Sequence, residues 1–333
     1  YTEPVSYVWG HCWIYLDGTK SLTIRGAGAE QTVIGPEAYL VPPGEDYVVG
    51  VMPAGRTLAL SNLTIINGYY GIAANSNAII DSCHFRYCYT AVQVTGVGHS
   101  LEMSRSRIYD PQDQLFTTGI SCSTTDALIT DCEVIGHQAA VVLSDLGGPD
   151  RRLEGCYLEG PFHHGTGVGI FDGFTGVVTG NTIRGFTVGV RVSIAPRITF
   201  SGNVVEDCED AGIHLYGDNG AVTMEQNVVR DCGMCLRIFG PDVTDEIHGN
   251  HFLRDEANDG WYVRTQDAYP WDPDEIDLSE NYWGTTDLAE IALWIQDGHD
   301  DPDHNFYVLV APVADAPVRS EPRSWSQVKG LFE

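Results

Sequence analysis

The seven residues GNVVEDC, Gly202 to Cys208, return 24 residues later as QNVVRDC, Gln226 to Cys232. When the chain is aligned on the second valine of this motif, similar segments recur every 20 to 26 residues, with one longer interval at the end. The aligned residues are Ile65, Phe85, Ile108, Val134, Leu158, Ile183, Val205, Val229, Phe252 and Trp283. Such a period takes precedence over any domain count drawn from the length of 333 residues. The sequence therefore predicts a repeat protein.

Each repeat contains short runs that alternate apolar and polar residues. GIHLYG at 212–217 and CLRIFG at 235–240 are bounded by Gly, Asp and Asn, as strands commonly are. A column of apolar residues, often preceded by Gly or Ala, opens about seven residues after the aligned one: Ile72, Val92, Ile120, Val141, Ile170, Val190, Ile213 and Leu236. A unit this short cannot enclose a core alone, so copies must stack. The sequence predicts an all-β fold, a parallel β-helix of roughly ten coils.

A second column, two residues before the aligned one, ends in an unbroken asparagine run: Asn181, Asn203, Asn227, Asn250 and Asn281. An amide both donates and accepts, so asparagines stacked coil on coil can satisfy one another; the alternative is that they merely suit a turn. With the Gly-Ile strands and NYWGTTDLAEI at 281–291, this column resembles the right-handed, single-stranded parallel β-helix proteins of the pectate-lyase-like superfamily, which include many secreted bacterial repeat proteins. The resemblance implies an asparagine ladder and a secreted or extracellular-surface location.

The composition is strongly acidic. Lys and Arg number 18 against 46 Asp and Glu, a formal net charge of −28, which argues against nucleic acid or an anionic membrane as a partner. No apolar run approaches the ~18 residues of a membrane-spanning helix, and no signal peptide opens the chain. Because it begins abruptly with YTEPVSYVWG, we expect a trimmed mature chain or an excised segment, with a further domain or assembly partner at either end.

The nine cysteines fall mostly into two columns of the repeat. One column holds Cys83, Cys132 and Cys156, and the other holds Cys88, Cys208 and Cys232. Small, nearly apolar residues in such columns indicate reduced thiols that fill an interior stack. Oxidation of neighbours such as Cys132 and Cys156 stays an alternative, because adjacent strands lie only ~4.8 Å apart. A zinc site is disfavoured, because Cys232 and Cys235 lack a second ligand pair.

The chain changes character after Trp283. Thr286 is a candidate N-cap for a helix over DLAEIALWIQD at 287–297, and Gly298 follows as a stop. A helix at this place would cover the open end of the stacked strands. The sequence thus predicts three segments: a parallel β-helix over 1–284, a helical cap over 285–310 and a Pro-rich tail or linker over 311–333.

Function is expected on the outward side of the strands, because the inward side is used for stacking. The outward column next to the Gly-Ile column is predicted to hold Ala73, Gln93, Ser121, Val142, Phe171, Arg191, His214, Arg237 and Val263. Arg191, His214 and Arg237 then stand on three successive coils, with Phe171 before them and aromatic side chains beside them: Tyr216 and Phe239. Two Arg residues ~10 Å apart repel by only ~0.4 kcal/mol in water. Guanidinium forks match carboxylates, and aromatic rings match the apolar faces of sugars.

In pectate-lyase-like enzymes the substrate groove lies along the strand that this column resembles. The resemblance implies that Arg191 and Arg237 bind a uronate carboxylate, that His214 or Tyr216 moves the proton from the neighbouring carbon, and that the aromatic residues contact substrate. The chain lacks the paired aspartates of polygalacturonases, the Tyr-Gly-x-Asp-Pro-His run of alginate epimerases and a calcium-binding carboxylate cluster with a catalytic lysine. The alternative is that the three residues are ordinary solvated side chains.

Three further features are candidates for a site. Asp172 is either an inward carboxylate or part of a turn with Gly173. His163 and His164 form a pair without an identifiable partner carboxylate. The insertion 255–277 carries Trp261, Tyr262, Tyr269 and Trp271 among many acids, and is either a calcium-ordered rim, a sugar-binding wall or a solvated loop. No metal ligands are assigned, and calcium is the one cofactor considered.

Three classes of function stay open at this point. The first is a secreted enzyme with lyase or epimerase chemistry on uronate-containing glycans. The second is a non-catalytic carbohydrate-binding module, and the third is a structural element of a larger extracellular assembly. The sequence favours engagement of a polysaccharide or cell-surface glycan and leaves catalysis open.

Overall fold

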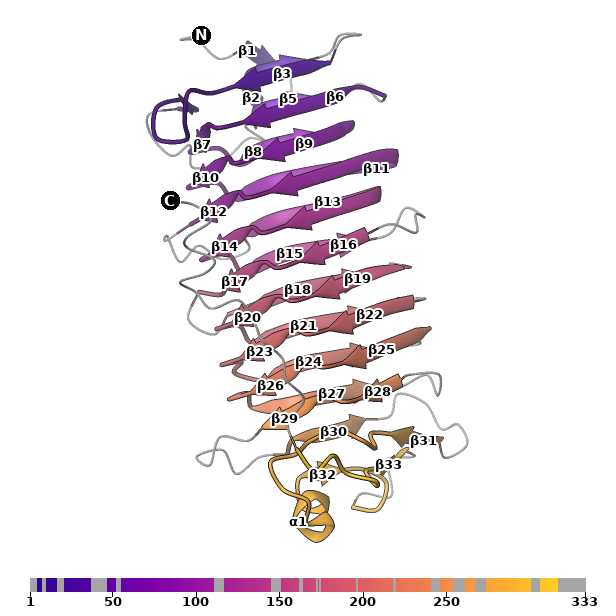
Figure 1. Cartoon of the computed structure of the whole chain (residues 1–333). Helices are drawn as coiled ribbons and strands as arrows, with labels where there is room; N and C mark the ends of the chain where they lie inside the picture. The colour runs from indigo at the N-terminus through magenta and orange to yellow at the C-terminus, as the bar shows by residue number, and fades with distance from the viewer. Residues whose placement is uncertain are drawn as a thin grey trace. The chain divides into compact units, whose positions relative to one another are not determined.

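The structure is a computed structural model of the chain (Figure 1). It describes residues 5–7, 10–16, 21–36, 47–51, 55–110, 117–144, 151–161, 164–171, 173, 175–195, 197–217, 220–240, 246–253, 261–266, 274–300 and 306–316. The chain divides into two compact units, unit 1 (Tyr1–Pro161 with Ser324–Glu333) and unit 2 (Phe162–Arg323). In each unit the chain winds through three stacks of parallel strands, which we call faces 1, 2 and 3 in the order in which a coil visits them.

Unit 1 contains the first coils. Face 1 consists of β3 (Leu22–Arg25), β6 (Thr57–Ser61), β9 (Asn77–Asp81), β16 (Arg151–Glu154) and the second halves of β11 (Thr90–Ser104) and β13 (Thr118–Thr130). Face 2 consists of β4 (Val33–Ile34), β7 (Thr64–Ile66), β10 (His84–Arg86), β12 (Arg107–Tyr109), β14 (Glu133–Ile135) and β17 (Tyr157–Glu159). Face 3 consists of β2 (Gly10–Leu16), β5 (Tyr47–Val51), β8 (Tyr70–Ala74), β15 (Ala139–Ser144) and the first halves of β11 and β13. β1 (Val5–Tyr7) pairs antiparallel with β2.

Unit 2 repeats the arrangement. Face 1 consists of β19 (Thr175–Thr179), β22 (Arg197–Ser201), β25 (Ala221–Glu225) and β28 (Glu246–His248). Face 2 consists of β20 (Thr182–Arg184), β23 (Val204–Glu206), β26 (Val228–Arg230) and β29 (His251–Leu253). Face 3 consists of β18 (Thr166–Phe171), β21 (Val188–Ser193), β24 (Ala211–Tyr216), β27 (Met234–Phe239), β30 (Val263–Gln266) and β32 (Ile295–Gln296). Among the described residues face 2 has six strands in unit 1 and four in unit 2, which confirms the predicted β-helix of roughly ten coils.

The corner between faces 1 and 2 explains the repeated heptapeptide. At nine corners of the described chain two residues separate the strands, the first with positive φ and the second buried. In GNVVEDC, Gly202 (φ 61°) makes this corner, Asn203 turns inward, 204–206 form β23, and Asp207 (φ 56°) makes the next corner. The second copy does the same with Gln226 (φ 57°) and Asp231. The motif is therefore one short strand with both of its corners.

The predicted asparagine ladder is present in unit 2. The Asn227 Oδ1 accepts from the backbone N of Asn203 (3.0 Å) and from its Nδ2 (2.9 Å). The Asn227 Nδ2 donates to Asn250 Oδ1 (2.8 Å) and to the Phe200 carbonyl (3.0 Å). Asn181 and Asn281 extend the same pattern at the two ends of the run, and all five side chains are fully buried. Both amide protons and both lone pairs of Asn227 are used, which rules out the simpler reading of a turn preference alone.

The core is formed by the inward residues of the strands. On face 3 of unit 2 the pairing aligns these fully buried residues: Val168, Val190, Ile213, Leu236 and Val263. The assignment of Ile170 to this column was wrong, because Ile170 pairs with Val192. In the run GVGIF both apolar residues follow a glycine, so the sequence cannot distinguish the two registers. A glycine is required immediately before the buried residue of this column. At Gly189, which precedes Val190, a Cβ would lie 2.4 Å from Val205 Cγ1 and 2.7 Å from the Gly212 carbonyl.

The eight cysteines whose side chains are described are buried thiols, as predicted. Burial raises the pKa of Cys83 to about 11 and that of Cys88 to about 12. A hydrogen bond to Cys232, together with burial, raises the pKa of Cys208 well above its usual range. Because the thiolate is the nucleophile, thiols of this kind are unreactive at neutral pH. They serve to pack the interior of the coils.

The C-terminal helix is present but shorter than predicted. α1 spans Leu288–Ala292, and in Figure 1 it lies beyond β30 at the end of unit 2. The prediction of Thr286 as the N-cap was wrong, because the Asp287 carboxylate accepts from the backbone N of Ala289 (2.9 Å) and caps the helix. The predicted extension to residue 297 was also wrong, because Ile295 is 5% exposed and pairs in β32 with β30. Burial of the Ile295 side chain in the sheet favours the strand over a longer helix.

Two short strands and the start of the tail complete unit 2. β31 (Asp274–Asp277) and β33 (Phe306–Leu309) form a two-stranded parallel sheet. The backbone N of Ala314 donates to the Asn281 carbonyl (3.2 Å), so the first described residues of the Pro-rich tail contact the last ladder residue. The segment boundaries at 284 and 310 stay predictions. Among the described residues, no helix is both long and apolar enough to cross a membrane.

Substitution of Asn227 by Ala tests the ladder. We expect a loss of about 2–4 kcal/mol in the free energy of unfolding, because the buried N–H and Nδ2 of Asn203 lose their acceptor. Urea denaturation followed by circular dichroism measures this. The exposed Asn75 in unit 1 is the control, since Asn75→Ala should change stability by no more than about 0.5 kcal/mol. Equal losses in the two variants would contradict a structural role of the ladder.

Candidate functional site

The candidate site lies on the outward side of face 3 in unit 2. In β24 Ile213 and Leu215 are buried, while His214 and Tyr216 between and after them face outward. The strand pairing places Arg191 beside His214, and His214 beside Arg237. Neighbouring members lie one strand spacing apart, about 4.8 Å. The structure therefore brings these three predicted residues together; their chemical roles stay a prediction.

The outward column continues to a residue that the sequence analysis missed. Arg237 pairs with Arg264, whereas Val263, predicted for this position, pairs with Leu236 and is fully buried. The insertion before β30 had shifted the alignment by one residue, which turns an outward position into an inward one. The sequence did contain a signal: in WYVRT the apolar Val263 stands between Tyr262 and Arg264, which favours an inward Val263 and an outward Arg264. We call Arg191, His214, Arg237 and Arg264 the Arg–His file.

Phe171 lies two residues further along its strand than predicted. Gly169, not Phe171, pairs with Arg191, and Phe171 pairs with Ser193 in the neighbouring outward column. The ring nevertheless bends back over the glycine, because a Cβ on Gly169 would lie only 2.6 Å from Phe171 Cε2. Phe171 therefore covers the end of the Arg–His file from the adjacent column.

Tyr216 and Phe239 form a stacked pair beside the file. Their ring centroids are 4.9 Å apart with an interplanar angle of 9°. Arg191 Cζ lies 5.5 Å from the centroid of the Tyr216 ring, and by register it comes from the coil on the opposite side to Phe239. Both faces of Tyr216 are thus occupied, and the ring supports the Arg191 guanidinium through a cation–π contact. A sugar approaching Tyr216 meets the ring edge and its hydroxyl.

The charges around His214 keep its imidazole neutral. Burial and the neighbouring Arg237 and Arg191 lower the pKa of His214 to about 4, and Asp210 opposes this shift. Its Nε2 is buried and has no hydrogen-bond partner among the described residues. The ring centroids of His214 and Tyr216 are 5.9 Å apart in a T-shaped arrangement. His214 is therefore an uncharged group between two cations at neutral pH.

Asp210 is a carboxylate in contact with the file. Its Oδ2 accepts from Arg237 Nη1 at 3.1 Å, with the Arg237 side chain 26% exposed and that of Asp210 37% exposed. A partly exposed ion pair of this kind contributes little to stability and exchanges readily. The Arg237–Asp210 pair shows that the file accepts a carboxylate.

Ile194 is a strained residue at the edge of the site. It follows β21 with φ 56°, whereas Gly217 and Gly240 occupy the corresponding position in the next two coils. A β-branched residue in this left-handed region costs about 1–2 kcal/mol. The Ile194 side chain is nevertheless 52% exposed, so burial does not offset the cost. Uncompensated strain beside a site is compatible with a role in ligand contact.

Of the other predicted candidates, those that the structure describes do not belong to the file. His164 is exposed on a loop, and His163 and Asp172 lie outside the described residues. In the insertion, Tyr262 is 4% exposed and packs edge-on against Trp294, and Trp261 is 38% exposed; Tyr269 and Trp271 lie outside the described part. Within the described ranges, no group of three or more His, Cys, Asp and Glu side chains is placed to hold a metal ion.

The titration of His214 tests the electrostatics of the file. We expect a pKa near 4 in the native protein, raised towards 6.5 by Arg237→Gln or Arg191→Gln and lowered further by Asp210→Asn. Ring proton shifts followed by NMR against pH measure it. Arg230→Gln, which removes an exposed Arg paired with Glu206 on face 2, is the control and should leave the value unchanged. A native titration near 6.5 would contradict the proposed environment.

Replacement of Ile194 by Gly tests the strain. We expect unfolding stability to rise by up to about 1 kcal/mol, since relief of the left-handed conformation exceeds the entropic cost of a glycine. The matched control is Ile79→Gly, at an exposed isoleucine inside β9 with ordinary strand geometry, and this should destabilise the protein. Thermal denaturation distinguishes the two. Destabilisation by both changes would show that Ile194 is not strained.

The comparisons with known proteins bear on the fold. Residues 118–254 match the family model described as a right handed beta helix region. No curated protein and no solved structure matches the chain. The match agrees with the stacked parallel strands and with the two-residue corners between faces 1 and 2 in this part of the chain. Residues 118–254 of the chain form a right-handed β-helix region; the repeat predicted the stacked coils, and the resemblance implied their hand.

Proposed function

We propose that face 3 of unit 2 binds an acidic polysaccharide of the uronate class, with the Arg–His file facing its carboxylates. One observation carries the proposal: three arginines and a neutral histidine stand in one outward column on four successive strands. Each guanidinium offers several N–H donors that match a carboxylate. A chain with regularly spaced carboxylates complements a column of regularly spaced cations.

The acidity of the whole molecule does not oppose this. The formal net charge is −28, but at physiological salt the repulsion of distant carboxylates is screened beyond about 8 Å. Asp210, the acid in contact with the file, is already paired with Arg237. A bound carboxylate therefore experiences chiefly the nearby guanidinium groups.

The aromatic residues have a supporting role in this proposal. Phe239 and Arg191 cover the two faces of Tyr216, so the stack orients Arg191 instead of offering Tyr216 as a sugar platform. Phe171 and Ile194 supply apolar contacts at the edge of the file. Since acidic polysaccharides of this kind occur outside cells, we also propose a secreted or cell-surface location.

Binding to oligogalacturonate tests the proposal. We expect saturable binding by isothermal titration calorimetry, weakened by salt and absent for the same oligomer with methyl-esterified carboxyls. Arg191→Gln and Arg264→Gln should each weaken binding about 10- to 100-fold, the equivalent of one lost charge-assisted contact of about 1.5–3 kcal/mol. Arg230→Gln on face 2 is the control. No binding of any acidic glycan would favour a purely structural role.

Lyase or epimerase chemistry is the second candidate, favoured by the neutral His214 between two cations. A carboxylate held by Arg191 and Arg237 would acidify the neighbouring C–H, and it would raise the pKa of His214 by neutralising those charges. His214 would then take that proton, and in a lyase the electron pair would form the C=C bond as the glycosidic oxygen leaves. The buried Nε2 and the pKa of about 4 in the free protein favour binding over catalysis.

The two candidates differ in their products. Catalysis predicts unsaturated or epimerised uronate that appears with wild-type protein and disappears with His214→Gln, while binding is retained. Absorbance of the unsaturated product and NMR of the oligomer are the measurements. Binding without product in both proteins would leave the non-catalytic function.

A further inference from the structure

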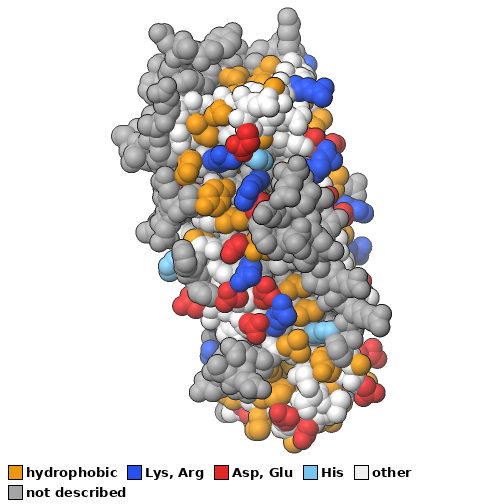
Figure 2. Space-filling view, turned by 60° about the vertical axis from the view of Figure 1, so that its left-hand side comes forward, with side chains coloured by type: hydrophobic (Ala, Val, Ile, Leu, Met, Phe, Trp, Pro, Cys, Tyr) orange, Lys and Arg blue, Asp and Glu red, His pale blue; other side chains and the backbone are white. Residues whose placement is uncertain are grey.

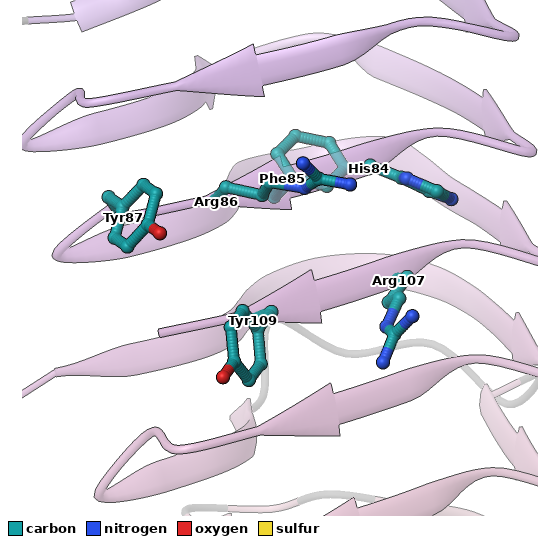
Figure 3. Close-up of a pocket in the computed structure, with 6 residues that line it drawn as sticks. All are labelled: His84, Phe85, Arg86, Tyr87, Arg107 and Tyr109. Atoms are coloured by element: carbon teal, nitrogen blue, oxygen red, sulfur yellow. The ribbon is translucent and has the colours of Figure 1, made fainter. Parts of the chain in front are cut away.

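A pocket of about 320 Å³ opens on face 2 of unit 1. It is lined by His84, Phe85, Arg86, Tyr87, Arg107 and Tyr109 (Figure 3). The side of unit 1 that carries face 2 comes forward in Figure 2, where basic, acidic and histidine side chains lie close together. The volume is at the lower end of the range of small-molecule sites.

Four of the six lining residues form a two-by-two lattice on neighbouring strands. β10 and β12 pair with His84 beside Arg107 and with Arg86 beside Tyr109. The two arginines are diagonal partners, and the other two corners carry an imidazole and a phenol. Burial lowers the pKa of His84, and Arg86 and Arg107 lower it further while Glu30 opposes the shift, so both guanidinium groups lie near the same ring. All four corners can donate hydrogen bonds.

Glu30 shows how an oxyanion sits in this lattice. Its Oε1 accepts from Arg86 Nη2 at 2.6 Å and lies 3.6 Å from His84 Nδ1. The Glu30 side chain is 71% exposed, and an ion pair this exposed contributes little and can be displaced. A ligand oxyanion could therefore replace the Glu30 carboxylate on Arg86 and His84.

Arg107 is held in place from the other side. Its Nε lies 2.9 Å from Glu133 Oε2, and Glu133 is 1% exposed. This contact leaves the terminal nitrogens of Arg107, whose side chain is 39% exposed, available to a ligand. In Figure 3 the polar ends of Arg107 and Tyr109 both point from β12 to the side away from β10.

Two tyrosines give the pocket apolar walls. Tyr109 is 36% exposed, and Tyr87 stands at the corner after β10 with φ 57°, a left-handed conformation that is strained for a bulky residue. Rings beside cationic donors suit a ligand that has both a charged group and a compact body.

We propose that this pocket is a second binding site, for a small oxyanion carried on a ring-sized body such as an acidic monosaccharide or a sugar phosphate, which displaces Glu30 from Arg86 and His84. The site is in a different unit and on a different face from the Arg–His file, and it does not depend on the function proposed there.

Titration calorimetry with glucuronate, glucose 6-phosphate, inorganic sulfate and glucose tests this. We expect saturable binding of at least one of the two sugar anions, weaker binding of sulfate and none of glucose. Arg86→Gln should weaken binding at least 10-fold, and Glu30→Gln should tighten it about threefold or more, because the internal competitor is removed. Arg152→Gln, at an exposed arginine of β16 paired with Glu154, is the matched control and should have no effect.

The opposite effects of the two pocket variants cannot arise from misfolding. Absence of saturable binding for all three anions, or binding that Arg86→Gln leaves intact, would overturn the site. Sulfate binding as tight as that of the sugar anions would overturn the assignment to a ring-bearing ligand. If Arg191→Gln instead of Arg86→Gln abolished binding of the sugar anions, the anion would be bound by the Arg–His file. The pocket proposal can therefore be wrong while the proposal for the file is right, and the reverse.

Discussion

The structure depends on hydrogen bonding between successive coils in one register. In unit 2 this constraint is most direct in the buried asparagines, where Asn227 uses its whole amide to join the coil before it to the coil after it. If the strand pairing shifted by one residue, the asparagine amide and the neighbouring inward hydrophobic residues would all face outward. In unit 1 the buried Cys132 and Cys156 occupy the corner position that the asparagines occupy in unit 2. The residue before each of them has a positive φ, as at the asparagine corners.

The same register decides the composition of the outer surface. On face 3 of unit 1 it aligns small or uncharged residues such as Ala73, Gln93 and Ser121. On face 3 of unit 2 it aligns arginines with His214, although these residues are more than 20 positions apart in sequence. Stacking thus converts a periodic chain into continuous rows of side chains, and each row can acquire its own chemistry without change to the interior.

Much of this organisation could be predicted from the sequence, because inward positions must be apolar or self-satisfying and therefore repeat visibly. The asparagine ladder and the neighbours Arg191, His214 and Arg237 followed from that periodicity. Three features did not follow. Both apolar residues of GVGIF follow a glycine, so the register was ambiguous and Phe171 was misplaced by two residues. The insertion before β30 shifted the alignment and hid Arg264. The apolar residues after α1 fit a helix as well as the strand that Ile295 joins. The pocket on face 2 was missed because its residues become neighbours through strands only three residues long, whose outward positions show no pattern.

The two-residue corner between faces 1 and 2 has a consequence for how such a chain can change. Its length is constant at nine corners of the described chain, whereas two to six residues join face 3 to the next face 1 in β8–β9, β15–β16, β21–β22 and β27–β28. Connections from face 2 to face 3 vary as well, as between β12 and β13 and between β29 and β30, so added sequence is accommodated at both of these corners. A grafted loop, epitope or tag would be tolerated there, and would disrupt the fold at the two-residue corner between faces 1 and 2.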